Sequence, residues 1–456
     1  MEEKQVLLTL SDGQKITIPR ENPNQLRVEM VDTLMCDFGF TNSQSVSYRI
    51  VNGKEPVKVL VETTDGVTAT VQKGNRLSGS ITLAFSPSEA TSGLLIVRAY
   101  DSERHEASAI VILTQKKQKE TPTISDDPTP ISFADPAVRT ALLGLCDSNG
   151  DGKISYAEAS RVPDLGTLFQ NNRNIKSFDE LQHFTSLKEI PNSAFSGCLR
   201  LTSVVIPKGV RSINEKAFSD CVRLTSVVIP ESVTSISHSA FRSCNSLTSV
   251  KIPEGVTSIG REAFNGCSSL TSVVILEGVT SIASQTFNYC SSLTSVVIPE
   301  SVTSIGYSAF NGCSSLTSVV IPESVTSMED SAFDGCSSLT SVVMPRGITS
   351  VPRFTFKNCS GLTSVVIPEG VRSIATQAFN SCSSLSSVVI PEGVRSIGDY
   401  VFYNCPRLIS LTLPSTLERI DLPLGVDPSC VITVPKGYTE KYRRWFSENK
   451  IVEAEE

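Results

Sequence analysis

The stretch CSSLTSVVIPESVTSIGYSAFNG occupies residues 290–312, and an almost identical stretch begins at Cys313. Written from Ser193, ten such units of 23 residues follow one another and end at Leu422. Each unit carries the same apolar positions, and one unit cannot bury its inner face alone. A fixed period of roughly 20–50 residues is the sequence signature of a repeat array. The sequence therefore predicts a long solenoid of stacked repeats.

Each unit predicts two short strands. LTSVVIP is a β-branched run that ends at a proline, and VTSI follows it after a turn. Strands stacked in register lie about 4.8 Å apart, so ten units would span roughly 48 Å. Leucine, isoleucine and phenylalanine columns are expected to fill the interior, as in solenoids of the leucine-rich class. The phenylalanine column comprises Phe195, Phe218, Phe241, Phe264, Phe287, Phe310, Phe333, Phe356, Phe379 and Phe402.

Ten cysteines recur with the same spacing of 23 residues, and they could be disulfides, metal ligands or packing residues. Stacked residues have Cβ atoms about 4.8 Å apart, whereas a disulfide needs about 3.5–4.5 Å. Zinc sites use CxxC pairs or Cys/His clusters, which do not occur in this sequence. The spacing favours a ladder of buried free thiols, with some disulfides or a metal as the alternatives. The ladder comprises Cys198, Cys221, Cys244, Cys267, Cys290, Cys313, Cys336, Cys359, Cys382 and Cys405.

Length and charge limit the number of domains and the classes of partner that the chain can have. The chain has 456 residues, which is too long for one compact core, and its net charge is −7. An acidic chain argues against nucleic acid or an anionic membrane as partner. No stretch approaches the ~18 apolar residues of a membrane-spanning helix. The start, MEEKQVLLTL, lacks the basic and apolar regions of a signal peptide, so we expect an intracellular protein or a mature chain without its leader.

Residues 1–114 predict a separate all-β domain. Eight or so short alternating runs are separated by turn formers such as Asp12-Gly13 and Asn52-Gly53. That number of strands in about 110 residues suggests a β-sandwich of immunoglobulin-like shape. Cys36 stands alone there, so the Cys…Trp…Cys pattern of antibody domains is missing. Residues 115–131 are polar and rich in proline and threonine, which predicts a linker.

Residues 132–192 predict a small helical cap that contains an EF-hand-like calcium loop. DSNGDGKISYAE fits the twelve-residue pattern D-x-[DN]-x-[DN]-G-x5-E. Calcium prefers six or more hard oxygen ligands, and this spacing folds them around one point. A single loop favours one structural Ca²⁺ ion over a sensor, and an unfilled polar turn is the alternative. The predicted ligands are Asp147, Asn149, Asp151, the carbonyl of Lys153, Ser155 through water, and Glu158.

Strand alternation in LTSVVIP places the first valine and the isoleucine inward and the second valine outward. An exposed aliphatic stripe along a sheet can mark a binding face. The alternative is that another segment of each repeat covers the stripe. This outward column, hereafter the valine column, comprises Val205, Val228, Lys251, Val274, Val297, Val320, Val343, Val366 and Val389, and Thr412 continues it.

Residues 423–456 predict a C-terminal cap, because a solenoid needs protected ends. VPKGYTEKYRRWFSENK predicts a helix with Thr439 as the N-cap. Tyr442, Trp445 and Phe446 fall on one face of that helix and are expected to cover the last repeat.

The sequence gives little support for an enzyme. His105, His183 and His238 lie in unrelated contexts. The chain has no G-x-S-x-G elbow, no P-loop and no dinucleotide-binding glycine motif after a strand. We therefore expect a non-catalytic protein.

The stretch AFNGCSSLTSVVIPESVTSI resembles the BspA-type leucine-rich repeat family of bacterial surface proteins, and the resemblance covers about residues 193–422. FADPAVRTALLGLCDSNGDGKISYAEA, followed by FDELQHFTSLKEI, is also similar to the calcium-loop cap that precedes such arrays in gut bacterial members. Leu276, in place of the repeat proline, is one departure and leaves the fold prediction intact.

This resemblance implies an extracellular or cell-surface location and adhesive or ligand-binding work. The main hypothesis is an adhesin-like protein that presents its repeats to host matrix proteins or other cells. A glycan-binding module of a nutrient-capture system and a structural surface spacer are the alternatives.

Overall fold

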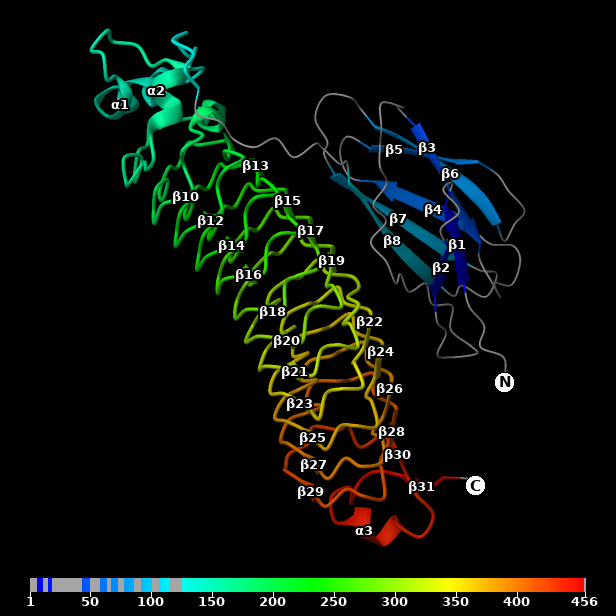
Figure 1. Cartoon of the computed structure of the whole chain (residues 1–456). Helices are drawn as coiled ribbons and strands as arrows, with labels where there is room; N and C mark the ends of the chain where they lie inside the picture. Colours follow the sequence, from blue (N-terminus) through cyan, green and yellow to red (C-terminus); the bar gives the residue numbers. More distant parts are fainter. Residues whose placement is uncertain are drawn as a thin grey trace. The chain divides into compact units, whose positions relative to one another are not determined.

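The structure is a computed structural model. It describes residues 125–454 continuously, and before them only the backbone of eight strands. The chain divides into two compact units, Met1–Glu120 and Thr121–Glu456. Figure 1 shows both units. Cys36, His105 and residues 115–124 of the predicted linker lie outside the described residues.

The first unit contains two antiparallel sheets within its described residues. One sheet has the strand order β2-β1-β3-β6-β5 and the other has the order β4-β7-β8. A sandwich of immunoglobulin-like shape stays a prediction, because the side chains of these strands are not described. The strands are β1 Val6–Leu10, β2 Lys15–Ile18, β3 Ser43–Arg49, β4 Lys58–Thr63, β5 Val67–Gln72, β6 Ser78–Phe85, β7 Ser92–Tyr100 and β8 Glu106–Thr114.

The second unit is a β-solenoid, as the repeats predict. The SVV segment of nearly every repeat forms a strand of three or four residues, here called a major strand. Each major strand pairs in parallel with the equivalent residues of the next repeat where the sheet is continuous, for example Ser203 with Ser226. The major strands are β11 Ser203–Val205, β13 Ser226–Val228, β15 Ser249–Ile252, β17 Ser272–Ile275, β19 Ser295–Val297, β22 Ser341–Val343, β24 Ser364–Val366, β26 Ser387–Val389 and β28 Ser410–Thr412.

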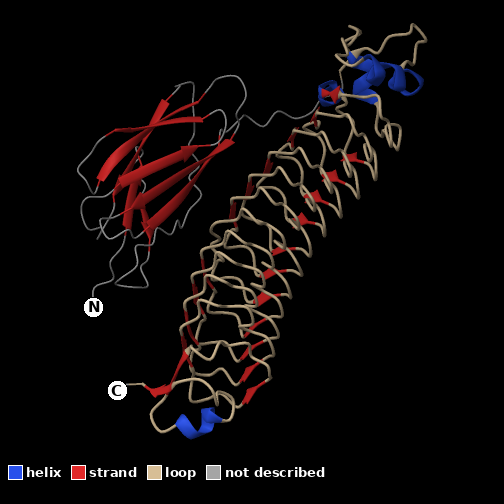
Figure 2. Ribbon diagram, turned by 180° about the vertical axis from the view of Figure 1, so that it is seen from behind, coloured by secondary structure: helices blue, strands red, loops and turns tan. Residues whose placement is uncertain are grey.

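The second predicted strand of each repeat, VTSI, is shorter. It forms a two-residue minor strand, and the minor strands also pair in parallel. Figures 1 and 2 show the minor strands along one side of the solenoid and the major strands along the other. The minor strands are β12 Ser212–Ile213, β14 Ser235–Ile236, β16 Ser258–Ile259, β18 Ser281–Ile282, β20 Ser304–Ile305, β21 Ser327–Met328, β23 Ser350–Val351, β25 Ser373–Ile374, β27 Ser396–Ile397 and β29 Arg419–Ile420.

The phenylalanine column forms one continuous stack inside the solenoid. From Phe195 to Phe402, successive ring centroids lie 5.1–5.9 Å apart and the ring planes differ by no more than 13°. Phe169 extends this stack into the N-terminal cap, with its centroid 5.3 Å from that of Phe195. The sequence did not predict this extra ring, because Phe169 lies 26 residues before Phe195 and is outside the 23-residue period.

The ten cysteines of the ladder are buried and free, which confirms the predicted thiol ladder over the disulfide alternative. Each thiol also makes a contact that size alone does not predict. From Cys221 onward its Sγ donates to the carbonyl of the phenylalanine one repeat earlier, and Cys198 donates to that of Phe169 in the cap, at 2.9–3.3 Å overall. Burial raises the pKa of Cys267 and Cys313 to about 12. The thiols are therefore neutral weak donors within the core.

The N-terminal cap joins two short helices to the first turns of the solenoid. Helix α1 spans Pro136–Cys146 and α2 spans Tyr156–Arg161. Asp135 caps α1 by accepting from the Ala137 backbone N–H, and Pro136 starts the helix. The 3₁₀ helix η1, Asp179–His183, lies between β9 and β10, which begin the two parallel ladders. These two strands span Ser177–Phe178 and Glu189–Ile190.

The C-terminal cap consists of β30 Val431–Val434, α3 Thr439–Arg443 and β31 Ile451–Glu453. Tyr442 and Phe446 are buried and Trp445 packs against the core. Thr439 was predicted as the N-cap, and that prediction is wrong. Tyr438 occupies the cap position, while the Thr439 hydroxyl donates to Glu453 Oε1 at 2.8 Å. Within the described residues, no helix has the length and apolar character needed to cross a membrane.

Candidate functional site

The predicted calcium loop connects α1 to α2 and folds around Asp147. Its Oδ1 accepts from the Gly150 N–H at 2.7 Å, and its Oδ2 accepts from the Gly152 N–H at 2.9 Å. Both glycines have a positive φ, +74° and +75°, which L side chains rarely adopt. The sharp turn that the motif requires is therefore present.

The next two oxygen donors also face the loop backbone. Asn149 Oδ1 accepts from the Asp151 N–H at 2.9 Å, and Asp151 Oδ1 accepts from the Lys153 N–H at 2.8 Å. Ser155 caps α2 and accepts from the Glu158 N–H at 3.2 Å. The loop thus presents carboxylate and amide oxygens, the hard ligands that suit Ca²⁺.

Glu158 is buried and both of its oxygens are engaged. Oε1 accepts from the Ser148 N–H at 2.9 Å, and Oε2 accepts from the Ser155 N–H at 2.9 Å. The hydroxyls of both serines add a second bond each. Burial opposes ionisation, but the hydrogen bonds from Ser155 and Ser148 outweigh it and lower the pKa of Glu158 to about 2. Glu158 is therefore an ionised, fully hydrogen-bonded carboxylate.

The donor chemistry fits calcium, while the arrangement of side chains is not that of a closed coordination shell. Within residues 125–454, no three side chains of His, Cys, Asp or Glu are placed to share a metal ion. To coordinate an ion, Glu158 would give up some of its hydrogen bonds from Ser148 and Ser155. Calcium at this loop consequently stays a prediction.

The second candidate is the valine column on the major strands. Val228, Val320, Val366 and Val389 are 52–66% exposed. Each follows a residue that faces the interior, in keeping with strand alternation. The other predicted members are half-buried, namely Val205, Lys251, Val274, Val297 and Val343.

Val320 lies where the ladder of major strands is interrupted. Its repeat has no major strand, and Ser318 makes only an isolated bridge to Ser341. The described ladder is in four pieces, β13-β11-β9, β15-β17-β19, β22-β24 and β26-β28-β30-β31. Lys251 is the one predicted charge in the column, and its Nζ pairs with Glu231 Oε1 at 2.9 Å. The column is therefore predominantly aliphatic and locally neutral.

Threonines flank the valine column and form a regular ladder. Each Oγ1 donates to the carbonyl of the threonine one repeat earlier, at 3.0–3.5 Å, from Thr225 to Thr363. These hydroxyls are fixed by the backbone, which orders the surface beside the valines. The result is an extended surface with similar chemistry in most repeats.

The family comparison gives the same architecture. The sequence pattern described as "BspA type Leucine rich repeat region (6 copies)" matches residues 188–317 and 303–423, just over half of the chain. The chain belongs to the BspA-type leucine-rich repeat family. No curated protein matches it.

Several solved structures are similar to this BspA-type chain. A leucine-rich repeat protein from Bacteroides ovatus is 24% identical, with a TM-score of 0.44, covering 86% of this chain and 99% of that one. A leucine rich cell surface protein from Faecalibacterium prausnitzii is 24% identical, with a TM-score of 0.41 and coverages of 81% and 96%. A leucine-rich repeat protein from T. pallidum is 27% identical, with a TM-score of 0.30 and coverages of 45% and 77%.

Sequence reasoning missed one set of exposed side chains. Tyr289, Tyr307 and Tyr403 project from the loops that precede the cysteines, not from the strands. Their signal is visible in the sequence, because each replaces a small or polar residue that other repeats carry at the same position. Strand alternation predicts outward positions only within strands, and these tyrosines lie in loops.

Proposed function

We propose that this BspA-type protein is a non-catalytic, adhesin-like binding protein, secreted or held at the bacterial cell surface. It contacts host matrix proteins or other cells through its repeat surface. The observation that carries this proposal is the valine column, which exposes aliphatic side chains along an ordered array. Four of its valines are exposed and the others are half-buried, and aliphatic residues repeated along one face of a sheet can mark a binding surface.

The array suits binding by many weak contacts. Most repeats offer a valine beside a fixed threonine hydroxyl, and the repeats are about 4.8 Å apart. When several such contacts are engaged together, the later ones form intramolecularly and the overall affinity rises well above that of one contact. An extended or repetitive partner gains most from this arrangement.

The polar cluster around His238 does not suggest catalysis. Ser239 Oγ lies 3.3 Å from His238 Nε2 and 3.3 Å from Glu262 Oε2. Ser239 is only 1% exposed, so a substrate cannot reach its hydroxyl. His238 Nδ1 is 2.8 Å from the Arg261 carbonyl, which fixes the ring to the next repeat. These contacts hold the loops of adjacent repeats together.

For the N-terminal parts, we propose that the strands of residues 1–114 form a sandwich that acts as a stalk. We further propose that the loop at 147–158 binds one structural Ca²⁺ ion. Asp147, Asn149, Asp151 and Glu158 would hold it with the Lys153 carbonyl, and Ser155 would act through water. The ion would fix α1 against α2 and stabilise the cap.

The calcium proposal is tested by thermal unfolding of the full chain with Ca²⁺ and with excess EGTA. A ligand at 100 times its dissociation constant stabilises by about 2.7 kcal/mol, so EGTA should lower Tm. Asp147→Ala should remove that difference, and Asp164→Ala, an exposed aspartate outside the loop, should leave it intact. Identical melting curves with and without calcium would refute the ion.

The adhesin proposal is tested by immobilising the full chain and probing it with matrix proteins and whole cells. Retention of a matrix protein or of cells is the expected result. Binding to a glycan array without any protein or cell ligand would instead favour nutrient capture. No binding in either assay would leave the protein as a surface spacer and end the adhesin proposal.

A further inference from the structure

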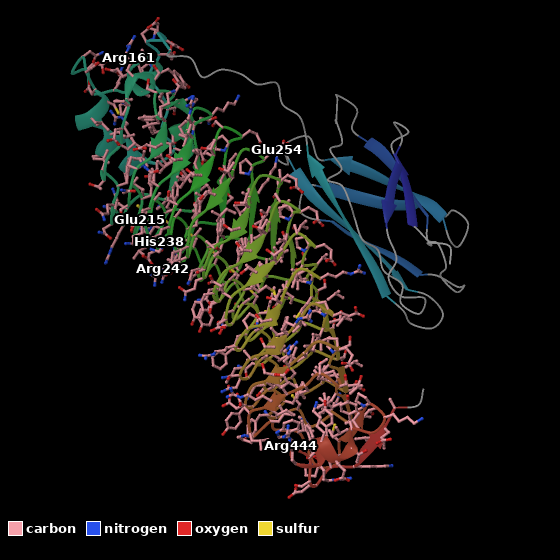
Figure 3. All side chains as sticks on the ribbon, turned by 60° about the horizontal axis from the view of Figure 1, so that its bottom comes forward. Arg161, Glu215, His238, Arg242, Glu254 and Arg444 are labelled. Carbon is pink, nitrogen blue, oxygen red and sulfur yellow. The ribbon has the colours of Figure 1, made fainter. Side chains whose placement is uncertain are left out.

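In every repeat a loop runs from the minor strand to the cysteine. These loops together form one edge of the solenoid, here called the loop edge. In Figure 3, Glu215, His238 and Arg242 mark this edge near its N-terminal end, while Glu254, on a turn after a major strand, lies on the other side. The residue before each cysteine has a positive φ, between +57° and +75°. These residues are Gly197, Asp220, Ser243, Gly266, Tyr289, Gly312, Gly335, Asn358, Ser381 and Asn404.

Tyr289 is the outlier of this column. The left-handed region suits glycine and tolerates asparagine or aspartate, but it is unfavourable for a bulky L side chain. The other nine members are Gly, Asn, Asp or Ser, whereas Tyr289 has φ +58°. Phe354 and Tyr400 also have a positive φ in these loops, +58° and +54°, so Tyr289 is distinguished by standing in a column of otherwise small residues.

The surroundings of Tyr289 leave its ring accessible. The residue is 61% exposed. A Cβ placed on Gly312 would lie 2.7 Å from the Cδ1 of Tyr289, so the edge of the ring occupies the space that a side chain at 312 would need. Gly335 is the next member, and a Cβ there would meet only the Gly312 backbone, at 3.5 Å. The ring thus stands beside bare backbone that extends for two repeats, about 10 Å.

Hydrogen-bonding groups lie beyond the bare backbone of Gly312 and Gly335. Asn358 follows Gly335 in the column, and its Nδ2 donates to Asp334 Oδ1 at 2.9 Å. Asp334 is half-buried, and burial raises its pKa. A carboxylate paired with an amide offers both acceptors and donors to a hydroxyl-rich ligand.

More exposed rings follow along the same edge. Tyr307 lies in the loop of the next repeat, and Tyr403 lies in the loop of the last one. Tyr400 packs edge-on against Tyr403, with ring centroids 5.6 Å apart and planes at 83°. From the repeat of Tyr289 to that of Tyr403 is five repeats, or about 24 Å. The exposed rings therefore share one edge of the solenoid, although they occupy three different positions within their loops.

We infer that the loop edge from Tyr289 to Tyr403 binds a neutral polysaccharide chain that lies along the solenoid axis. The tyrosine rings stack on the apolar C–H faces of the sugars, because an aromatic ring offers a flat apolar face. Asp334 and Asn358 hydrogen-bond to sugar hydroxyls between the rings. This site lies apart from the valine column, and it does not depend on the adhesin proposal.

Two other classes of partner fit this edge less well. A protein partner favours a central cluster of aromatic anchors ringed by water-excluding contacts, whereas these rings are separated by small polar residues. A polyanion needs a surface rich in basic side chains. The loops that precede Cys290 to Cys405 instead hold four acidic residues, Glu329, Asp330, Asp334 and Asp399, against two basic ones, Arg353 and Lys357. An uncharged chain of hydroxyl-bearing units is the ligand class that the composition favours.

The test is affinity electrophoresis of the full chain through gels that contain neutral polysaccharides, a β-glucan, an α-mannan, a xylan and a starch, or acidic polygalacturonate. At least one neutral polysaccharide should retard the protein. Tyr289→Gly should weaken that binding by about 10-fold or more, while Tm stays level or rises, because glycine fits the left-handed conformation. Tyr289→Trp should retain binding. Tyr438→Ala, at an exposed tyrosine of the C-terminal cap, is the matched control and should bind normally.

A loss of binding without a loss of stability cannot be ascribed to unfolding. The inference fails if no neutral polysaccharide retards the chain, or if only polygalacturonate does. It also fails if Tyr289→Gly and Tyr403→Ala together leave retardation unchanged. Capture of matrix proteins by the same variants is expected to be unaffected, so failure here is distinguishable from failure of the adhesin proposal.

Discussion

The phenylalanine column and the valine column have the same 23-residue period but follow different rules. The inner column is phenylalanine in all ten repeats, and its rings are fully buried. The outer column admits Lys251 and then Thr412, and the loop edge varies further, with a tyrosine in place of a glycine. Stacking constrains an interior residue through both neighbours, whereas an outward residue has solvent on one side. The interior therefore maintains the fold, and departures from the repeat outside it mark where binding can be specific.

The largest expected effect is the loss of one ring from the stack. Phe310 lies 5.5 Å from Phe287 and 5.3 Å from Phe333, measured between ring centroids. Phe310→Ala should lower the free energy of unfolding by about 3–5 kcal/mol, because it leaves a cavity between two fixed rings. Chemical denaturation followed by circular dichroism measures this change. A cost below 1 kcal/mol would show that the stack does not hold the repeats together.

An intermediate effect on stability is expected at the N-terminal cap. There a single hydrogen-bonded carboxylate, that of Glu158, contributes to stability in place of a repeated stack of rings. The folded pKa of Glu158 is about 2, below its ordinary 4.5. Its stabilising contribution is therefore present above about pH 4.5 and is lost as the pH falls towards 2. Between these two values the Tm of the wild-type chain should fall more steeply than that of Glu158→Gln. Parallel slopes of Tm against pH would contradict the hydrogen-bonded carboxylate.

The smallest effect is expected on the outer column. Val320 is the most exposed member of the valine column, so Val320→Thr should change the free energy of unfolding by less than about 0.5 kcal/mol. Val319→Thr is the matched control, because it makes the same change at a buried neighbour and should cost clearly more. Equal costs at the two positions would show that the valine column is covered and is not a free binding face.

The sequence predicted the structure well at positions that recur in every repeat. It predicted less at residues that occur once, outside the repeat pattern. In-register stacking predicted the solenoid, its stacked short strands and the buried thiols, because the 23-residue period determines all three. It could not predict that Phe169 extends the stack, since the cap adjusts to the first repeat through irregular backbone. Thr439 failed as an N-cap because Glu453, on the strand that follows in the chain, takes its hydroxyl. The outward tyrosines were missed because their backbone conformation is a property of the loop and not of strand alternation.

The most direct test of the stacked interior is a titration of thiols without reducing agent, before and after unfolding. In the native chain, the ten ladder cysteines should react negligibly at pH 8, because burial keeps them neutral and inaccessible. After unfolding, all thirteen cysteines of the chain should react, namely the ten of the ladder, Cys146 and Cys430, which are also free, and Cys36. Rapid reaction in the native state would contradict the buried ladder. A shortfall of two or more thiols after unfolding would reveal disulfides and overturn the in-register stack.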